Sequence, residues 1–128
     1  MTGGVLVDTS VWVDHFRRRN ESLVDLLTLD LALTHPMIVT ELACGAPPAP
    51  RARTLADIAT LPQTRQAQLN EVRELIEREQ LFGLGYGLVD LALLTSALLT
   101  PGAQLWTQDK RLVQLAQRFG IAYRPARH

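Results

Sequence analysis

The sequence Val5-Leu6-Val7-Asp8-Thr9-Ser10 joins a short apolar, β-branched run to a carboxylate and two hydroxyl residues. The run predicts a buried strand that ends at Asp8. Thr9 or Ser10 can cap a helix that begins at once. The segment therefore predicts a strand that passes directly into a helix.

The rest of the chain continues this alternation. The first helix is expected to end within 17–20, and further helices are predicted over 21–31, 36–44, 51–61, 66–81, 88–99 and 110–119. Short strands are predicted over 31–34, 103–107 and 121–123. The helix over 88–99 is apolar around most of its circumference and should be buried, whereas the helix over 66–81 is amphipathic. Strands that alternate with helices over one small domain argue for a parallel α/β sandwich.

Length and composition agree with a single domain over residues 1–128. Hydrophobic residues make up 47% of the 128 residues and charged residues 20%, which excludes a disordered tail or a fibrous protein. The 13 basic and 13 acidic residues balance, so net charge gives no argument for a purely electrostatic binder of nucleic acid or membranes. The single cysteine, Cys44, cannot form an internal disulfide and fits a reducing compartment.

No targeting or membrane segment is expected. The start of the chain lacks a basic region, and its apolar run soon meets Asp8. The stretch 84–106 carries one charge, Asp90, but Pro101-Gly102 breaks it and Asp90 would be costly within a membrane. We expect a buried helix and strand there, in a soluble, cytoplasmic protein.

Four acidic residues stand where a solvated surface charge is not expected. Asp8 ends the first strand, Asp109 opens the last helix, and both fall at strand ends, where open parallel sheets bind ligands. Glu41 has mostly apolar neighbours, and Asp90 is the only charge in the predicted buried helix. Grouped together, the four would repel and raise one another's pKa until a cation was bound. Oxygen-only ligands suit Mg²⁺ or Mn²⁺ rather than Zn²⁺.

Each acid also has a purely structural alternative. Asp109 could cap the last helix, and Asp8 could be a turn or capping residue. Glu41 could pair with an arginine from another helix. Asp90 is the hardest to explain in this way, because few acids lie unpaired in such a helix.

Other polar and aromatic residues give weaker signals. The three histidines have no spacing typical of metal ligands or a catalytic triad and are interpreted as structural or surface residues; they are His15, His35 and His128. Trp12 and Phe16, four positions apart on the first helix, either belong to the core or line a groove for a partner helix.

Four segments resemble the motifs of PIN domains, in the same order. The first is Val5-Leu6-Val7-Asp8-Thr9-Ser10-Val11-Trp12, and the second is Pro36-x-Ile38-Val39-x-Glu41-Leu42-x-x-Gly45. The third is Gly85-x-Gly87-Leu88-Val89-Asp90-x-Ala92-Leu93-Leu94, and the fourth is Leu105-Trp106-Thr107-Gln108-Asp109-Lys110-Arg111-Leu112. Order, spacing and length are similar to those of VapC-type toxins, the ribonuclease half of bacterial toxin–antitoxin pairs. The resemblance covers nearly the whole chain.

The resemblance implies a PIN fold, with a central parallel sheet flanked by helices on both sides, and Mg²⁺- or Mn²⁺-dependent endoribonuclease activity. It assigns metal-binding and catalytic roles to Asp8, Glu41, Asp90 and Asp109. Asp8 and Asp90 would be direct ligands, and the other two would act directly or through waters. Ser10 and Thr107 match hydroxyl positions that orient Asp8 or the scissile phosphate.

The resemblance also implies partners. They are structured RNA such as tRNA or ribosomal RNA, an inhibitory VapB-type antitoxin, and a second copy of the chain in a homodimer. Some PIN proteins carry a further acid soon after the fourth. Here Lys110, Arg111 and Leu112 follow instead, which leaves the number of metal ions open.

A metal held by carboxylates lowers the pKa of its bound water and neutralises charge on the transferring phosphoryl group. The expected reaction is hydrolysis that leaves a 5′-phosphate and a 3′-hydroxyl, without a histidine base. Basic residues follow Asp109 and end the first helix, and a positive rim could hold the RNA backbone. The predicted RNA-binding residues are Arg17, Arg18, Lys110 and Arg111; the alternative is an ordinary solvated surface.

Two rival functions remain open. A phosphoacceptor receiver module is also a small parallel α/β domain with an acidic pocket and Mg²⁺. It needs an acidic pair after the first strand and an acceptor aspartate at the end of the middle strand. This chain has only Asp8 at the first strand, and Glu41 lies in a predicted helix. The second rival is a PIN domain without activity that serves only in binding.

Overall fold

The computed structural model describes residues 3–125, and a three-stranded parallel sheet lies at the centre of this region. Strand β1 (Gly4–Val7) lies between β2 (Ala32–Leu33) and β3 (Ala103–Trp106). Leu6 pairs with Leu33 on one side and with Leu105 on the other. A central strand covered on both faces must be apolar throughout, which explains why Val5, Leu6 and Val7 are all buried.

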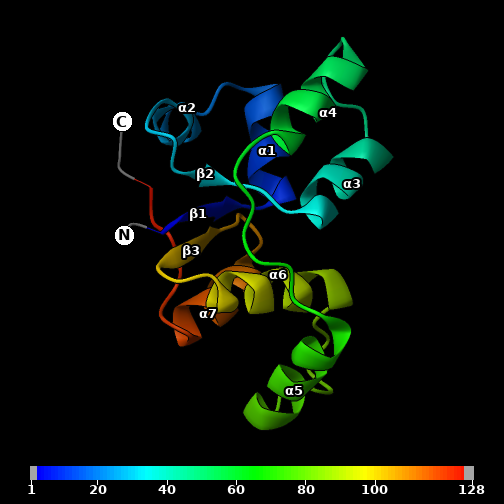
Figure 1. Cartoon of the computed structure of the whole chain (residues 1–128), viewed down its shortest axis with the longest axis vertical. Coiled ribbons are helices and arrows are strands. Elements are labelled where there is room, and N and C mark those ends of the chain that lie inside the picture. The colour runs from blue at the N-terminus through cyan, green and yellow to red at the C-terminus, as the bar shows by residue number, and fades with distance from the viewer. Residues whose placement is uncertain (1–2, 126–128) are drawn as a thin grey trace.

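Seven helices complete the described region. They are α1 (Thr9–Arg17), α2 (Glu21–Thr28), α3 (Pro36–Cys44), α4 (Arg51–Ala59), α5 (Leu69–Glu79), α6 (Leu88–Leu99) and α7 (Lys110–Arg118). Figure 1 shows α1 to α4 above the sheet and α5 to α7 below it. The predicted α/β fold, a central parallel sheet flanked by helices on both sides, is confirmed.

Several predicted boundaries are wrong, each for a local reason. The strand predicted over 121–123 is a single bridge between Ala122 and Leu105. The helix predicted over 21–31 ends at Thr28, because Asp30 adopts a positive φ of 57°. The helix predicted over 66–81 is limited to 69–79 by a capping box at Gln68 and a left-handed Gln80.

Helix α6 is buried as predicted. Every residue from Leu91 to Ala97 is buried, and α6 packs against both α5 and β3. Only its first turn, which carries Asp90, and its last residues reach the surface. None of the helices within residues 3–125 is long and apolar enough to cross a membrane. The core therefore fixes α6 and, with it, the position of Asp90.

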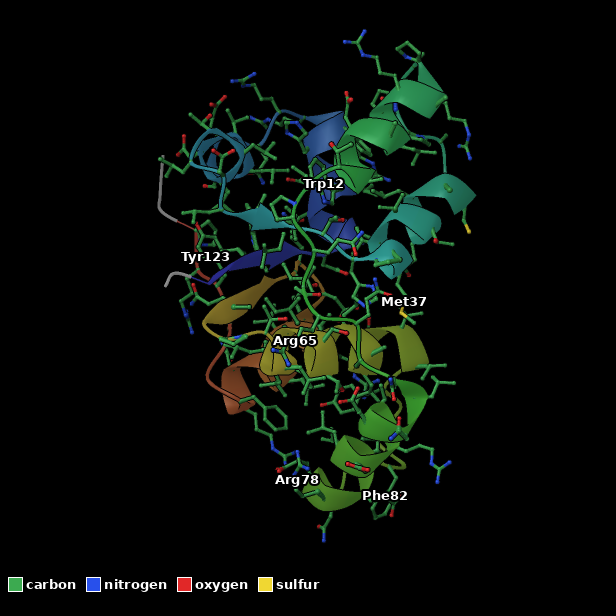
Figure 2. The ribbon with its side chains drawn as sticks, viewed as in Figure 1. Trp12, Met37, Arg65, Arg78, Phe82 and Tyr123 are labelled. Carbon is green, nitrogen blue, oxygen red and sulfur yellow. The ribbon has the colours of Figure 1, made fainter. Side chains whose placement is uncertain are left out.

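A buried polar link joins the start of α3 to the middle of α6. His35 is 4% exposed, and its Nδ1 caps α3 by accepting a hydrogen bond from the Met37 amide at 3.0 Å. Its Nε2 lies 3.1 Å from Ser96 Oγ, which also accepts a hydrogen bond from the Ala67 amide. Since Nδ1 accepts, the neutral ring carries its proton on Nε2 and donates to Ser96. Figure 2 shows Met37 at the same junction, pointing from α3 toward α6.

We expect the His35 link to make folding stability depend on pH. Burial lowers the pKa of His35 below 6.5, so the unfolded chain binds the proton more readily. Stability should be complete above about pH 6.5 and fall as the pH drops through the folded-state pKa. Urea denaturation should show that His35→Asn loses less stability than the wild type between about pH 7.5 and pH 5.5. Equal losses in both proteins would contradict this assignment.

Candidate active site

Asp8 is the most firmly held acid of the site. It ends β1, is 7% exposed and caps α1 with its own carboxylate, so neither Thr9 nor Ser10 is the cap that the sequence predicted. Oδ2 accepts hydrogen bonds from Ser10 Oγ at 2.7 Å, Thr107 Oγ1 at 2.9 Å and the Ser10 amide at 3.3 Å. No hydrogen bond within residues 3–125 reaches Oδ1. One carboxylate oxygen is therefore fixed by the protein and the other is available to a ligand.

The two hydroxyls that hold Asp8 also join two strand ends. Ser10 Oγ accepts a hydrogen bond from the Gln108 amide at 2.9 Å, and Thr107 Oγ1 accepts one from the Asp109 amide at 3.1 Å. The junction between β1 and α1 is thereby tied to the junction between β3 and α7. Asp8 and Asp109, which are distant in sequence, are thus held at one edge of the sheet.

Asp109 has the capping role that the sequence left open. Its Oδ1 accepts hydrogen bonds from the amides of Arg111 at 2.9 Å and Leu112 at 3.2 Å, at the start of α7. Oδ2 makes no hydrogen bond within the described residues. Capping and ligand binding would therefore use different oxygens of the same carboxylate.

Glu41 lies on α3 with its side chain exposed. Its Oε1 accepts a hydrogen bond from Thr9 Oγ1 at 2.7 Å. No arginine within residues 3–125 forms an ion pair with it, so the pairing alternative for Glu41 is wrong. Thr9 is a residue that the sequence reasoning missed as part of the site. Its position next to Asp8 was the available signal, because a hydroxyl in the first turn of α1 can reach a carboxylate that faces the same edge.

Asp90 connects all four acids electrostatically. It is half-buried in the first turn of α6. Burial and the charges of Asp8, Asp109 and Glu41 raise its pKa to about 6, and among the described residues Arg111 opposes this shift. The other three predicted site residues therefore lie within electrostatic reach of Asp90, although the four come from different segments of the chain.

The donors of this site fit a hard divalent cation chemically. All are carboxylate oxygens, and Asp8 Oδ1 and Asp109 Oδ2 have no protein partner in the described region. However, no group of three or more His, Cys, Asp or Glu side chains among residues 3–125 is arranged so that it could already hold a metal ion. Repulsion keeps like charges apart, so a bound cation would have to draw these side chains together.

The predicted RNA-binding residues differ in their surroundings. Arg17, Arg18 and Lys110 are exposed, and Arg17 lines a groove of about 520 Å³ together with Thr9 and Glu41. Arg111 is instead held against the loop before α6. Of the wider positive rim, Arg118 pairs with Glu79 at 3.3 Å, and Arg127 lies outside the described residues.

Trp12 belongs to the core, whereas Phe16 is half-buried. Both also line a cavity of about 440 Å³ between α1, α2 and α4, with Leu27 and Ile58 on its walls. Figure 2 shows Trp12 where α1 meets α4. The two alternatives given for these aromatics, core and groove, are therefore compatible.

The chain has curated relatives that match it over nearly its whole length. No family model matches the chain. Two curated relatives, both named Ribonuclease VapC32 and from two strains of Mycobacterium tuberculosis, are 43% identical to it over 118 residues. The alignment covers 92% of this chain and 94% of each relative.

We expect the acidic cluster to cost folding stability when no cation is present. Because the pKa of Asp90 is raised from 3.8 to about 6, its ionised form destabilises the fold above pH 6. Asp90→Asn should therefore raise the free energy of unfolding by on the order of 1 kcal/mol at about pH 7.5 in EDTA. The gain should shrink at about pH 4.5, where folded wild-type protein already carries the proton.

Urea denaturation at the two pH values measures this effect. Glu77→Gln, which removes an exposed acid on α5, serves as the matched control and should change little at either pH. A less stable Asp90→Asn protein at neutral pH would show that the carboxylates do not strain the fold.

Proposed function

The chain belongs to the VapC family of toxin ribonucleases, and on this premise we propose that it is a metal-dependent endoribonuclease that cuts structured RNA. The observation that carries the proposal is the shared electrostatic field of Asp8, Glu41, Asp90 and Asp109 at one edge of the sheet. A half-buried acid beside three others, with no ion pair in the described region, is typical of a site that receives a cation.

The proposed reaction is hydrolysis of a phosphodiester that leaves a 5′-phosphate and a 3′-hydroxyl. Bound Mg²⁺ or Mn²⁺ would supply an activated water and neutralise charge on the phosphoryl group. Asp8 and Asp90 would hold the ion directly, and Glu41 and Asp109 directly or through waters. Ser10 and Thr107 keep Asp8 Oδ2 engaged, so that Oδ1 would be left to hold the ion. Thr9 holds Glu41 at the rim of the same edge.

The proposed substrate is structured RNA, such as tRNA or ribosomal RNA, in the cytoplasm. Arg17, Arg18, Lys110 and Arg111 would bind its backbone, and Arg17 and Glu41 line the same groove between α1 and α3. Contacts of this kind position the RNA without reading its sequence. They also predict that RNA binding weakens steeply as salt is added.

A VapB-type antitoxin is the proposed inhibitory partner, and a homodimer is the proposed assembly. The cavity lined by Trp12 and Phe16 has mainly apolar walls contributed by three helices, which suits one face of an amphipathic peptide helix. A small open reading frame directly upstream of the gene would support the antitoxin proposal.

The rival functions fit less well. A receiver module requires an acidic pair after its first strand, whereas β1 is followed by Asp8 alone. A stable aspartyl phosphate formed with a small phosphodonor would nevertheless favour that rival. A PIN domain without activity is distinguished by a nuclease assay with Mn²⁺ that is repeated after chelation.

We expect cleavage of structured RNA to require both the cation and the acids. Purified protein should cut RNA in Mn²⁺ or Mg²⁺ and stop when EDTA is added. Asp8→Asn and Asp90→Asn should each lower the cleavage rate at least about 100-fold, because each removes a charged ligand, while the circular dichroism spectrum stays native. The control Glu77→Gln should cleave normally. Full activity of Asp90→Asn would refute the assignment.

The same comparison identifies the substrate in cells. RNA 5′ ends sequenced from cells that express the wild-type protein should show new sites that are absent from cells that express Asp8→Asn. Identical 5′ ends in both samples would count against a nuclease.

A further inference from the structure

Arg111 is held in place beside the acidic cluster by the loop before α6. Its Nη2 donates to the carbonyl of Leu84, and its Nη1 donates to that of Gly85 at 3.5 Å. Its guanidinium also lies over the ring of Tyr86, 5.0 Å from the centroid. Three consecutive residues of one loop therefore fix a side chain that would otherwise be mobile on an exposed surface.

Gly85 makes this arrangement possible. Its φ of +84° is a left-handed conformation that side chains rarely adopt. A Cβ added there would lie 3.0 Å from Arg111 Nη1 and 3.3 Å from Nη2. The loop thus approaches the guanidinium closely through backbone alone, and the glycine is required both by its conformation and by this contact.

The contacts of Arg111 hold its charge without cancelling it. The partners of its guanidinium are carbonyl oxygens and an aromatic face, and it forms no ion pair within residues 3–125. Its charge nevertheless acts on Asp90 and opposes the repulsion from the other acids. An arginine whose charge acts on Asp90, but which forms no ion pair in the described region, retains N–H groups for another anion.

We propose that Arg111 is a fixed positive charge of the active site, which binds the phosphate at which the RNA is cut. The proposal rests on the ribonuclease function proposed above. A guanidinium held in advance by Leu84, Gly85 and Tyr86 supplies positive charge to an anionic phosphate without reorganisation.

This role separates Arg111 from the other basic residues. Lys110 is exposed and has no partner within the described residues, so it provides a mobile charge for the RNA backbone. Arg111 provides a planar fork in a set orientation, which an ammonium group cannot reproduce. Exchange of Arg111 for lysine should therefore impair cleavage although the charge is retained.

The test measures Mn²⁺ affinity without RNA and the single-turnover cleavage rate in the full-length protein. Arg111→Gln removes the charge but keeps an amide that can donate to the loop, and Arg111→Lys keeps the charge but loses the fork. We expect Arg111→Gln to bind Mn²⁺ roughly threefold to tenfold more tightly, because a repelling charge is gone, yet to cleave about 100-fold more slowly. Arg111→Lys should bind Mn²⁺ like the wild type and cleave about 10-fold more slowly.

Matched changes at Arg73, an exposed arginine on α5, should alter neither quantity. Weaker Mn²⁺ binding by Arg111→Gln would overturn the proposal, since it would show that Arg111 only positions the loop and Asp90. Cleavage by Arg111→Gln within about threefold of the wild-type rate would also overturn it. If Arg111→Gln fails to fold, a wild-type rate in Arg111→Lys overturns it instead.

The measurements distinguish failure of the proposed ribonuclease function from failure of the role of Arg111. Wild-type protein that neither binds Mn²⁺ nor cuts RNA would remove both proposals together. Wild-type protein that cuts RNA, with Arg111 variants that cut it equally well, would remove only the role of Arg111.

Discussion

The hydrogen bonds to Asp8 Oδ2 are the interaction on which the site depends. The donors lie at the start of α1 and directly after β3. One carboxylate oxygen therefore links the two segments from which α1 and α7 begin. The same two hydroxyls, of Ser10 and Thr107, accept hydrogen bonds from the backbone amides of Gln108 and Asp109 and so fix the backbone before α7. Asp8 is thereby both the cap of α1 and the residue that ties the start of this helix to the end of β3.

The edge of the sheet at Asp8 concentrates negative charge that no ion pair within residues 3–125 neutralises. Asp90 has its pKa raised because burial and three neighbouring carboxylates disfavour its charged form. Ionised Asp90 destabilises the fold as long as no cation offsets this repulsion. Arg111, held by backbone carbonyls, weakens the repulsion on Asp90. It forms no ion pair with any of the four acids in the described region.

The sequence predicted those features that follow from hydrophobic pattern and local turns. The bounds of α3 and α6 were correct because Pro36 and Gly45 delimit the first, and a largely apolar segment between Gly87 and Pro101 forms the second. The strand over 121–123 was wrong because pairing with β3 stops after one residue, and no local pattern records that. Periodicity does not reveal contacts between residues that are far apart in the sequence. The hydrogen bond from Thr9 to Glu41 spans 32 positions, and the one from Arg111 to Gly85 spans 26.

The burial of α6 has a consequence for divergence among relatives. Since every side from Leu91 to Ala97 is enclosed, a substitution large enough to rotate this helix would disrupt packing before it altered the acid at its start. The end of α1 and the exposed loop around Phe82 are free of that restriction. Sequence change is therefore expected to be tolerated more readily at those exposed positions than along the buried part of α6.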